Sequence, residues 1–568
     1  MKNRKIGIII MITLFLFGCK PNPEIPPADG EQQEEDENST VKVTVTFNVD
    51  GGTPSYQPVS INKGSALGDQ YPADPQKSGN AFGGWYDVND ASYLLKYIKT
   101  TVINDNITLK ARWLPVEPEI ILLTIGAKKD LSSLLGASMS GQTVTWSSSD
   151  PTKVSVDANG NITSNLTSFT AAEGGSKKYT EEPAKAQVTI TAIAGGNAKT
   201  FKVTATIEAQ ENIMELPPLK DRFPAGILVG NIAASGDAGA SSIINTKLTR
   251  HFNALTSEND MKPSSVSNGR NSATGVISYT WNNADKFVNA AAASKFEIIG
   301  HTLLWHSQIP AWQTNMATES KATALTAMKQ FINDVMTRYK GKIYSWDVLN
   351  EAFPDGVSAG SDWKNVMRQE NPWYKAIGSD FVYEAYLEAR KADPKAKLYY
   401  NDFNTDQIGK ATMIRDMVRD VNNKYKNEYP AETRLLIEGI GMQEHHNTGV
   451  SASNINAALT LFKAIGVKVS VSEIDVLGQD WSSFSSVGQG ANKQNQSTVT
   501  NNGLLTQASL YQQYMQVYMK FTDIIERISF WGITDNQSWR SAGLPLLFDN
   551  NGKAKPAYYR FIGALPAN

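Results

Sequence analysis

The chain has 568 residues, a formal net charge of −2 and 41% hydrophobic residues. A chain of this length exceeds what one core can organise, so we expect about three or four domains. The near-neutral net charge lacks the excess of basic residues that is typical of nucleic-acid-binding proteins. The single cysteine excludes an internal disulfide and a Cys-based metal site.

The first residues indicate a targeting segment. Three basic residues among the first five precede an apolar run over 6–17, which is too short to span a bilayer. The run closes on LFLFGC, which resembles a bacterial lipobox ending at Cys19. We expect a signal peptide over 1–18 to be removed and Cys19 to be lipidated, anchoring the protein to a membrane of the cell envelope, at the outer membrane or cell surface. An ordinary signal peptide followed by an incidental cysteine is the alternative.

A tether and a first β module follow the targeting segment. Residues 19–39 are rich in proline and acidic side chains, which predicts an extended tether. Residues 40–115 begin with the alternating strand VKVTVTFNVDGG, and with FGGWYD and INDNITLKARW they resemble the β-rich repeat module of bacterial surface proteins, of the internalin B-repeat type. We expect Trp85 and Trp113 to lie in its core, with a sugar-stacking platform as the alternative.

Residues 116–212 are again patterned as short strands. The stretch QTVTWSSSDPTKVSVDANGNIT, followed by AQVTITAIAGG and TFKVTATI, resembles a bacterial immunoglobulin-like domain of group 2. Alternating strands joined by Asp-Pro, Asn-Gly and Gly-Gly turns are typical of a β-sandwich, and Trp146 is expected in its core. Both β modules are therefore predicted to be spacers or weak binding modules.

From residue 213 to 568 the pattern changes to strands that alternate with amphipathic helices. Eight such units predict a C-terminal (β/α)8 TIM barrel, so the fold class is two small all-β modules followed by a TIM barrel. The expected strands are 225–232, 252–260, 296–305, 343–351, 397–404, 437–445, 468–476 and 528–535.

The expected strand ends are consistently polar, and a TIM barrel gathers its active site at those ends. They read TSENDMK, GHTLLWHSQ, WDVLNE, YYNDFN, GIGMQEHH, VSEIDV and WGITDNQSWR. The absence of glycine-rich loops and basic clusters argues against phosphate chemistry, and no His-Glu-x-x-His spacing indicates a metal. We therefore expect no metal and no cofactor. Two glutamates, hydrogen-bonding side chains and aromatic planes are the requirements for hydrolysing a glycosidic bond.

The motifs GHTLLWHSQIPAW, WDVLNEAF, GIGMQEHH, VSVSEIDV and FWGITDNQSWR resemble, in this order, those of glycoside hydrolase family 10, the retaining endo-β-1,4-xylanases. The resemblance covers residues 215–566. It implies Glu351 as general acid/base and Glu473 as nucleophile. It also implies that Asn350 bonds the 2-hydroxyl of the cleaved sugar, and that His445 and Asp475 tune the nucleophile; a solvated loop carboxylate is the alternative for Asp475.

The same resemblance implies a set of substrate-binding residues. The distal xylose would be bound by Glu258, Asn259 and Lys262. The site of the cleaved sugar would have a floor and walls formed by His301, Trp305, Gln308 and Gln443, with Trp531 and Trp539 above the sugar ring. The set also includes His306, Asn401 and Arg540. Pro263 departs from the aromatic residue common at its position. His306 could instead be a packing residue, and Asn401 with Asp402 could support the acid/base loop.

The polar stretch 482–503 is an insertion-like loop that could add contacts on the leaving-group side. The expected partner is xylan, cleaved by a monomer. Two alternatives stay open: another β-glycanase that cuts glucan on the same barrel, and a glycan-binding lipoprotein with an inactive barrel.

Overall fold

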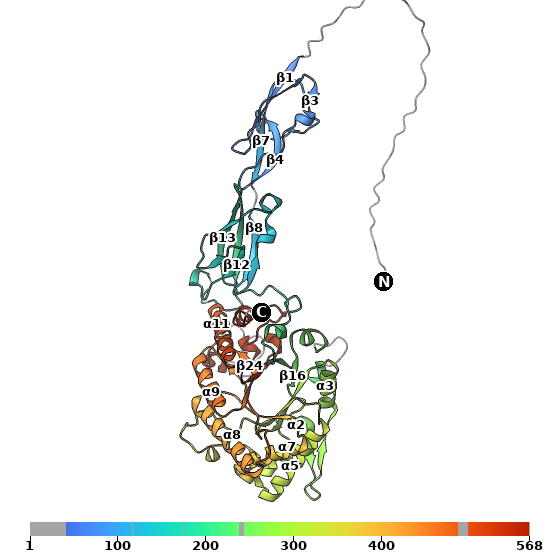
Figure 1. Ribbon diagram of the computed structural model, residues 1–568, viewed down its shortest axis with the longest axis vertical. Coiled ribbons are helices and arrows are strands. Elements are labelled where there is room, and N and C mark those ends of the chain that lie inside the picture. The colour runs from blue at the N-terminus through green and yellow to red at the C-terminus, as the bar shows by residue number, and fades with distance from the viewer. Residues whose placement is uncertain are drawn as a thin grey trace, which may run out of the picture. The chain divides into compact units, whose positions relative to one another are not determined.

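The computed structural model describes residues 41–115, 118–173, 175, 177–237, 244–486 and 498–566 (Figure 1). The expected signal segment, Cys19 and the tether lie outside these residues. The chain divides into two compact units, Met1–Pro115 and Val116–Asn568. No helix within the described ranges has the length and apolar character needed to cross a membrane.

The first unit is a small β module. Its five-stranded sheet has the order β2-β1-β7-β4-β5, beside the short pair β3–β6. Trp85 is fully buried and meets Phe47 edge-on at a centroid distance of 5.0 Å, while the indole N–H of Trp113 donates to the carbonyl of Val49 at 3.0 Å. Both tryptophans are therefore used inside the module. The strands are β1 Lys42–Asn48, β2 Val59–Asn62, β3 Ser65–Ala66, β4 Asn80–Asp87, β5 Lys96–Tyr97, β6 Val102–Ile103 and β7 Ile107–Pro115.

The second unit begins with a β-sandwich. A four-stranded sheet, β10-β13-β14-β8, packs on a three-stranded sheet, β11-β12-β9. Alternate residues of β13 are buried, as expected when one face of an antiparallel sheet covers a core. Trp146 stacks on Phe201 with ring centroids 6.2 Å apart. The strands are β8 Glu119–Thr124, β9 Lys128–Asp130, β10 Thr145–Ser148, β11 Val154–Val156, β12 Asn161–Ser164, β13 Lys185–Ala194 and β14 Asn197–Thr206.

The rest of the second unit is the predicted barrel. Eight parallel strands follow one another in a ring, which the pairing of β22 with β24 closes, and this confirms the expected fold class. The barrel strands are β15 Leu228–Ala233, β16 Ala254–Ser257, β19 Glu297–Leu304, β20 Ser345–Asn350, β21 Lys397–Asp402, β22 Gly439–Met442, β24 Lys468–Val476 and β25 Ile525–Phe530. A hairpin of β17 Ser267–Arg270 and β18 Ile277–Tyr279 lies outside the ring.

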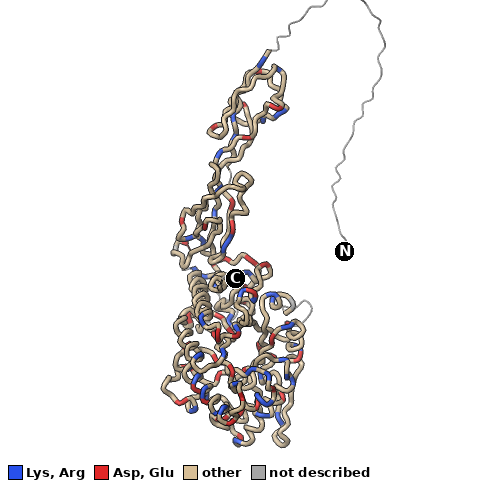
Figure 2. Tube along the Cα trace, viewed as in Figure 1, with Lys and Arg blue, Asp and Glu red and all other residues tan. Residues whose placement is uncertain are grey.

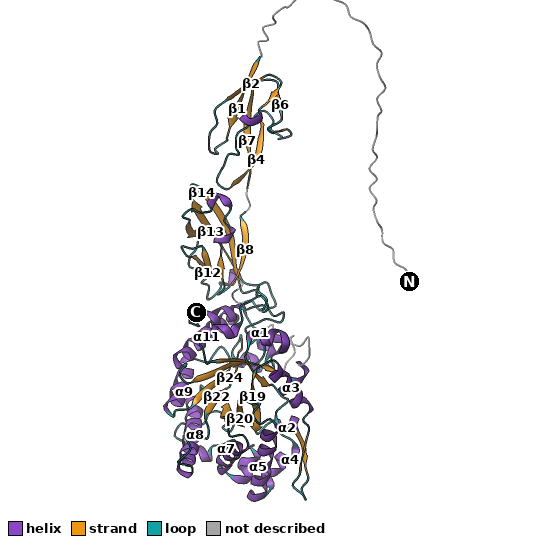
Figure 3. Ribbon diagram, turned by 45° about the vertical axis from the view of Figure 1, so that its right-hand side comes forward, coloured by secondary structure: helices purple, strands orange, loops and turns teal. Residues whose placement is uncertain are grey.

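Helices surround the ring of strands (Figure 3). Helix α5 illustrates why they form: Ser320 caps its first turn by accepting from the N–H of Thr323, and apolar residues at helical spacing bury one face. The helices are α1 Thr249–His251, α2 Pro263–Val266, α3 Asn282–Ala293, α4 Ala311–Asn315, α5 Lys321–Arg338, α6 Pro372–Ile377, α7 Asp380–Ala392, α8 Ile408–Glu428, α9 Ala452–Ala464, α10 Trp481–Ser485, α11 Asn501–Tyr518 and α12 Pro556–Gly563.

The strand expected over 437–445 is interrupted. It forms β22 and then, after Glu444 in a left-handed conformation with φ 60°, the two-residue strand β23 (His445–His446), which pairs with β24. The last barrel strand also begins and ends earlier than the expected 528–535, because the polar stretch after Phe530 already belongs to the loop. The interruption places His445 beside the strand that carries Glu473.

The immunoglobulin-like domain packs directly on the barrel, which its expected role as a spacer did not predict. The N–H of Tyr179 donates to the carbonyl of Val499 at 2.8 Å, and a β-bridge joins Lys178 to Thr500. The side-chain oxygen of Asn502 accepts from the N–H of Phe169 at 3.0 Å. The partners on the barrel are Val499 and Thr500, just before α11, and Asn502 in its first turn, so the domain contacts the start of this helix. Acidic and basic residues are interspersed along the trace (Figure 2).

Candidate active site

Glu473 lies on β24 and is 5% exposed. Its Oε1 accepts a hydrogen bond from Nδ2 of Asn401 at 2.8 Å, and its Oε2 lies 3.1 Å from Nε2 of His445. Burial opposes ionisation, but the hydrogen bonds from His445 and Asn401 outweigh it and lower the pKa of Glu473. Glu473 is thus an ionised, oriented carboxylate.

His445 connects Glu473 to Asp475. Its Nδ1 donates to Oδ2 of Asp475 at 2.9 Å, and the same oxygen accepts from the indole N–H of Trp539 at 3.2 Å. Burial would lower the pKa of His445, but the neighbouring carboxylates Asp475 and Glu473 raise it to about 9. A protonated His445 donates from both ring nitrogens, so the imidazolium is fixed between two carboxylates.

Glu351 directly follows β20 and has a left-handed backbone conformation with φ 55°. Non-glycine residues rarely adopt this region, so the surroundings must hold the side chain in place. Its Oε2 accepts from the indole N–H of Trp305 at 2.9 Å, and its Oε1 accepts from Nε2 of Gln443 at 3.0 Å. Unlike Glu473, Glu351 is only partly buried.

An amide network joins the two glutamates. Oδ1 of Asn350 accepts from Nδ2 of Asn401 at 3.0 Å and from Nε2 of Gln443 at 3.2 Å. Asn401 also bonds Glu473, and Gln443 also bonds Glu351. Asn401 and Gln443, both predicted to contact substrate, therefore hold the carboxylates through their amide nitrogens.

The residues predicted for the distal xylose gather at the end of β16. Nζ of Lys262 donates to Oδ1 of Asn259 at 2.9 Å and to Oε1 of Gln308 at 2.7 Å, and it lies 5.1 Å from the ring centroid of Trp305. Burial raises the pKa of Glu258 and lowers that of Lys262. Pro263 begins α2, where the missing N–H of a proline costs nothing.

His301, Trp531 and Trp539 line the region around the nucleophile. Nδ1 of His301 donates to Oδ2 of Asp347 at 2.9 Å. The ring of Trp531 lies 5.6 Å from the ring of His301, and the ring of Trp539 lies 5.1 Å from that of His445. The ring of His445 also lies 6.2 Å from that of Trp531 and so connects the three side chains, while their contacts with a sugar stay a prediction.

Two predicted substrate-binding residues have other surroundings. Arg540 is 2% exposed, forms an ion pair with Asp475 and donates to the carbonyl of His446 at 3.1 Å, so it positions Asp475 from the interior. Burial, aided by the positive charge of Arg368, lowers the pKa of His306 to about 4, which keeps its imidazole neutral near pH 7. A packing role suits His306 better than an ionic one.

Asp347 and Glu444 support the site but were not singled out in the sequence. Asp347 bonds His301; Glu444 accepts from the hydroxyl of Tyr518 at 2.6 Å. Asp402, considered only as a support, is fully buried and lies 2.9 Å from Nζ of Lys410. Asp347 could have been noticed, because it is a carboxylate within WDVLNE, in the expected strand that ends at Glu351.

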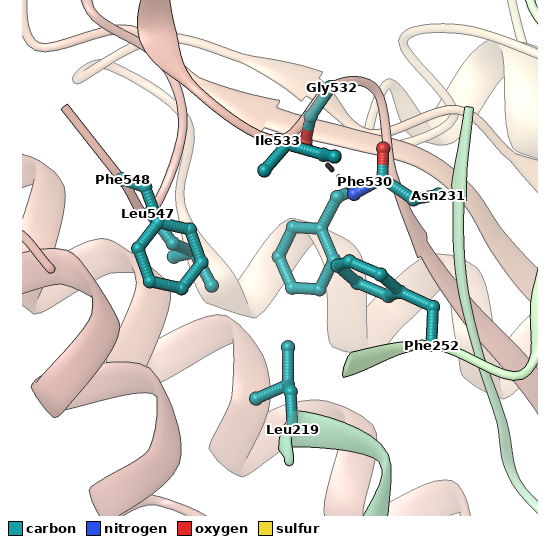
Figure 4. A pocket seen from close by; sticks show the side chains of 8 residues that line it. All are labelled: Leu219, Asn231, Phe252, Phe530, Gly532, Ile533, Leu547 and Phe548. Atoms are coloured by element: carbon teal, nitrogen blue, oxygen red, sulfur yellow. Dashed lines mark hydrogen bonds between the residues drawn. The ribbon is translucent and has the colours of Figure 1, made fainter. Parts of the chain in front are cut away.

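A small cavity elsewhere in the barrel is distinct from these residues. It is lined by Leu219, Asn231, Phe252, Phe530, Gly532, Ile533, Leu547 and Phe548 (Figure 4). Its one side-chain amide, that of Asn231, already donates to the carbonyl of Gly532 at 3.1 Å. The side chain of Asn231 is thus already hydrogen-bonded, and the other side chains that line the cavity are apolar. Within the described ranges no group of three His, Cys, Asp or Glu side chains could hold a metal ion.

The geometry provides two carboxyl groups in opposite environments. Glu473 is buried and held ionised, whereas Glu351 is more open and contacted by neutral N–H donors. One group is suited to attack a carbon and the other to transfer a proton, which is the division of labour in retaining glycosidases.

Comparisons with known proteins agree with this chemistry. The model of glycosyl hydrolase family 10 matches residues 219–564, that of the Listeria-Bacteroides repeat domain matches 44–112 and that of the bacterial Ig-like domain (group 2) matches 114–175. A crystal structure of a bacterial Ig-like domain-containing GH10 xylanase from termite gut is 53% identical, with a TM-score of 0.75, and covers 78% of this chain and 98% of that one.

Curated relatives match over the barrel. Endo-1,4-beta-xylanase A of Thermotoga maritima is 32% identical over 360 residues, which is 61% of this chain and 30% of that protein. Endo-1,4-beta-xylanase of Geobacillus stearothermophilus is 32% identical over 328 residues, which is 56% of this chain and 89% of that protein. The match thus spans less than a third of the Thermotoga protein. With more than half of its length matched by one family model, the chain belongs to glycosyl hydrolase family 10.

Proposed function

We propose that the protein is an endo-β-1,4-xylanase that hydrolyses internal linkages of xylan with retention of configuration. The observation that carries the proposal is the contrast between the two carboxyl groups: Glu473 is held ionised by His445 and Asn401, while Glu351 is contacted by Trp305 and Gln443. The names of the relatives described above support xylan as the substrate.

The proposed reaction has two displacements. In the first, a carboxylate oxygen of Glu473 bonds to the anomeric carbon, the glycosidic bond breaks, and Glu351 gives its proton to the leaving oxygen. In the second, Glu351 takes a proton from water, the water oxygen bonds to the same carbon, and Glu473 is released. Asn350 is proposed to bond the sugar 2-hydroxyl, beside Glu351.

The stereochemical outcome tests this proposal. Proton NMR of freshly hydrolysed xylo-oligosaccharide should show the β-anomer of the new reducing end first, with the α-anomer appearing only by mutarotation. An α-anomer formed first would require an intervening water and would refute the double displacement. Cleavage of β-glucan but not xylan would favour the other β-glycanase, and a folded protein inactive on both would favour a glycan-binding role.

We also propose that the protein acts in the cell envelope, held to a membrane by lipid on Cys19. Support comes from the basic and apolar residues that precede the only cysteine of the chain. The acidic, Pro-rich stretch that follows would separate the enzyme from the membrane surface.

A further inference from the structure

Glu444 is a buried acidic residue that lies between two residues which hold the glutamates of the site. Gln443 donates from Nε2 to Glu351 at 3.0 Å, and Nε2 of His445 lies 3.1 Å from Glu473. Glu444 itself is only 1% exposed. Acidic side chains are almost never buried this fully unless they are paired, so the position of Glu444 requires an explanation.

The backbone of Glu444 forms the turn that separates β22 from β23. Its φ of 60° is left-handed, a conformation that is costly for a residue with a side chain and persists only where the surroundings enforce it. The carbonyl of Glu444 accepts from the N–H of Asp475 at 3.3 Å, which attaches the turn to β24. Because Gln443 and His445 lie on either side of the turn, a change in its geometry would displace both.

Three donors converge on the carboxylate of Glu444. Oε2 accepts from the hydroxyl of Tyr518 at 2.6 Å and lies 3.0 Å from Nε2 of His446, and Oε1 accepts from the hydroxyl of Thr405 at 3.3 Å. Burial opposes ionisation, but the contact with His446 and the hydroxyl hydrogen bonds outweigh it and lower the pKa of Glu444. Since Tyr518 ends α11 and Thr405 follows β21, the carboxylate joins separate elements on the side of the turn away from the glutamates.

Two further ionisable groups lie near Glu444. Burial, aided by the charge of Glu444, raises the pKa of Asp406 and of Tyr514. Both shifts favour the neutral forms of these neighbours, so they reduce the repulsion that the buried carboxylate meets.

We propose that Glu444 is a positioning residue of the active site, which holds the left-handed turn from the α11 side so that its two neighbours in the sequence each reach their glutamate. The inference rests on the proposed function, because the two glutamates define the reaction that the turn serves. The effect of Glu444 should therefore appear in kcat and in the pH profile. Sugar binding by the residues at the end of β16 should change little.

The first test is Glu444→Ala in the full chain, assayed on an aryl xylobioside. The three donors lose their acceptor, so kcat should fall about 10- to 100-fold, as expected when reacting groups are slightly misplaced, while KM changes by less than about threefold. Because His445 is then less well placed against Glu473, the acidic limb of kcat/KM should also move up by about half a pH unit or more.

Glu444→Gly and Glu444→Gln separate the backbone from the side chain. Glycine adopts the left-handed region freely but carries no acceptor, so Glu444→Gly should be impaired like Glu444→Ala. Glutamine keeps an accepting oxygen for Tyr518 and His446 and can turn its NH2 group to the hydroxyl of Thr405. Glu444→Gln should therefore recover kcat to within about threefold of the wild type.

A milder variant keeps the test decisive if Glu444→Ala does not fold. Tyr518→Phe removes one donor and should move the acidic limb in the same direction, with a smaller loss of kcat. Tyr339→Phe is the matched control, because Tyr339 is 2% exposed and its hydroxyl also donates to a carboxylate, that of Asp285, at 3.1 Å. It should keep the kcat and the acidic limb of the wild type, even where it lowers the melting temperature as much as Tyr518→Phe does.

A wild-type kcat with an unmoved acidic limb in Glu444→Ala or Tyr518→Phe would overturn the inference while leaving the proposed function intact. Wild-type behaviour of Glu444→Gly beside an impaired Glu444→Ala would also overturn it, because the backbone alone would then account for the turn. Equal shifts in Tyr518→Phe and Tyr339→Phe would do the same, because any loss of stability would then have this effect. A wild type inactive on both xylan and the aryl xylobioside would instead refute the proposed function.

Discussion

Nε2 of His445 lies 3.1 Å from a carboxylate oxygen of Glu473, so a positive imidazolium touches the proposed nucleophile directly. The same ring donates from Nδ1 to Asp475, which fixes its orientation. This contact links the ionisation of Glu473 to a residue on a different strand, and the first two predictions follow from it.

The acidic limb of the pH profile should respond to His445. Glu473 must be ionised to attack, and its lowered pKa means that the active form exists above that pKa and is lost as pH falls through it. His445→Asn removes the positive charge, so the pKa of Glu473 should rise and the acidic limb of kcat/KM should move up by about one pH unit. The limb is measured as kcat/KM for an aryl xylobioside over a range of pH. If the limb of the His445→Asn variant lies at the wild-type pH, the assigned role of His445 is contradicted.

The stability of the protein should fall in mildly alkaline solution. The pKa of His445 is raised in the folded state to about 9, so its contribution is complete below the ordinary value of 6.5 and is lost as pH rises through about 9. The free energy of unfolding should drop by on the order of 1 kcal/mol per pH unit within this window. Denaturant titrations at several pH values measure the slope, and His445→Asn should flatten it.

Substitutions of the two glutamates should have different effects on activity. Glu473→Ala should abolish hydrolysis of every substrate, because no glycosyl-enzyme can form. Glu351→Ala should slow xylan cleavage by about 10²- to 10⁴-fold but spare the first step for an aryl xylobioside, whose leaving group needs no proton. Azide should rescue the Glu351 variant and give a β-glycosyl azide. An α-configured glycosyl azide would contradict the roles assigned to Glu351 and Glu473.

Removing the immunoglobulin-like domain should destabilise the barrel. A chain that begins at Gln210 loses the contacts of Tyr179 with Val499 and of Phe169 with Asn502, at the start of α11. Its melting temperature should fall by about 5 °C or more, since each kcal/mol lost costs about 2–4 °C in a domain of this size. A chain that begins at Val116 keeps the interface and is the matched control. Equal melting temperatures would restore the interpretation of the domain as a spacer.

The proposed membrane anchor depends on one atom, the sulfur of Cys19. Cys19→Ser should release the protein from membranes into the soluble fraction, because acyl chains bind by burying many methylene groups. Fractionation of expressing cells followed by immunoblotting measures this. Membrane association equal to that of the wild type would show that the anchor lies elsewhere.

The alternation of strands and helices predicted the barrel, and the resemblance of the strand-end motifs to glycoside hydrolase family 10 selected Glu351 and Glu473. The sequence could not predict that Gln443 bonds Asn350 and Glu351, or that the strand of His445 is interrupted. Those contacts depend on left-handed backbone at Glu351 and Glu444, which redirects side chains away from the regular alternation of a strand. Arg540 was assigned to substrate for the same reason: its motif is visible, but its burial against Asp475 is not.

The contact of the immunoglobulin-like domain with the barrel could not be predicted from the sequence either. Its contacts with Val499 and Thr500 are made by backbone groups, which every residue type carries. Hydrophobic alternation reports the core of each domain but not an edge that pairs through main-chain hydrogen bonds.

That pairing has a consequence for the order in which the protein is made. Phe169 and Asn502 are 333 residues apart. At about 5–20 residues per second, the ribosome adds Asn502 roughly 15–60 s after Thr206, the last residue of the sandwich strand β14. The sandwich must therefore remain folded without the barrel during synthesis. We expect its edge at Phe169 and Tyr179 to become ordered only when the last third of the chain has been added.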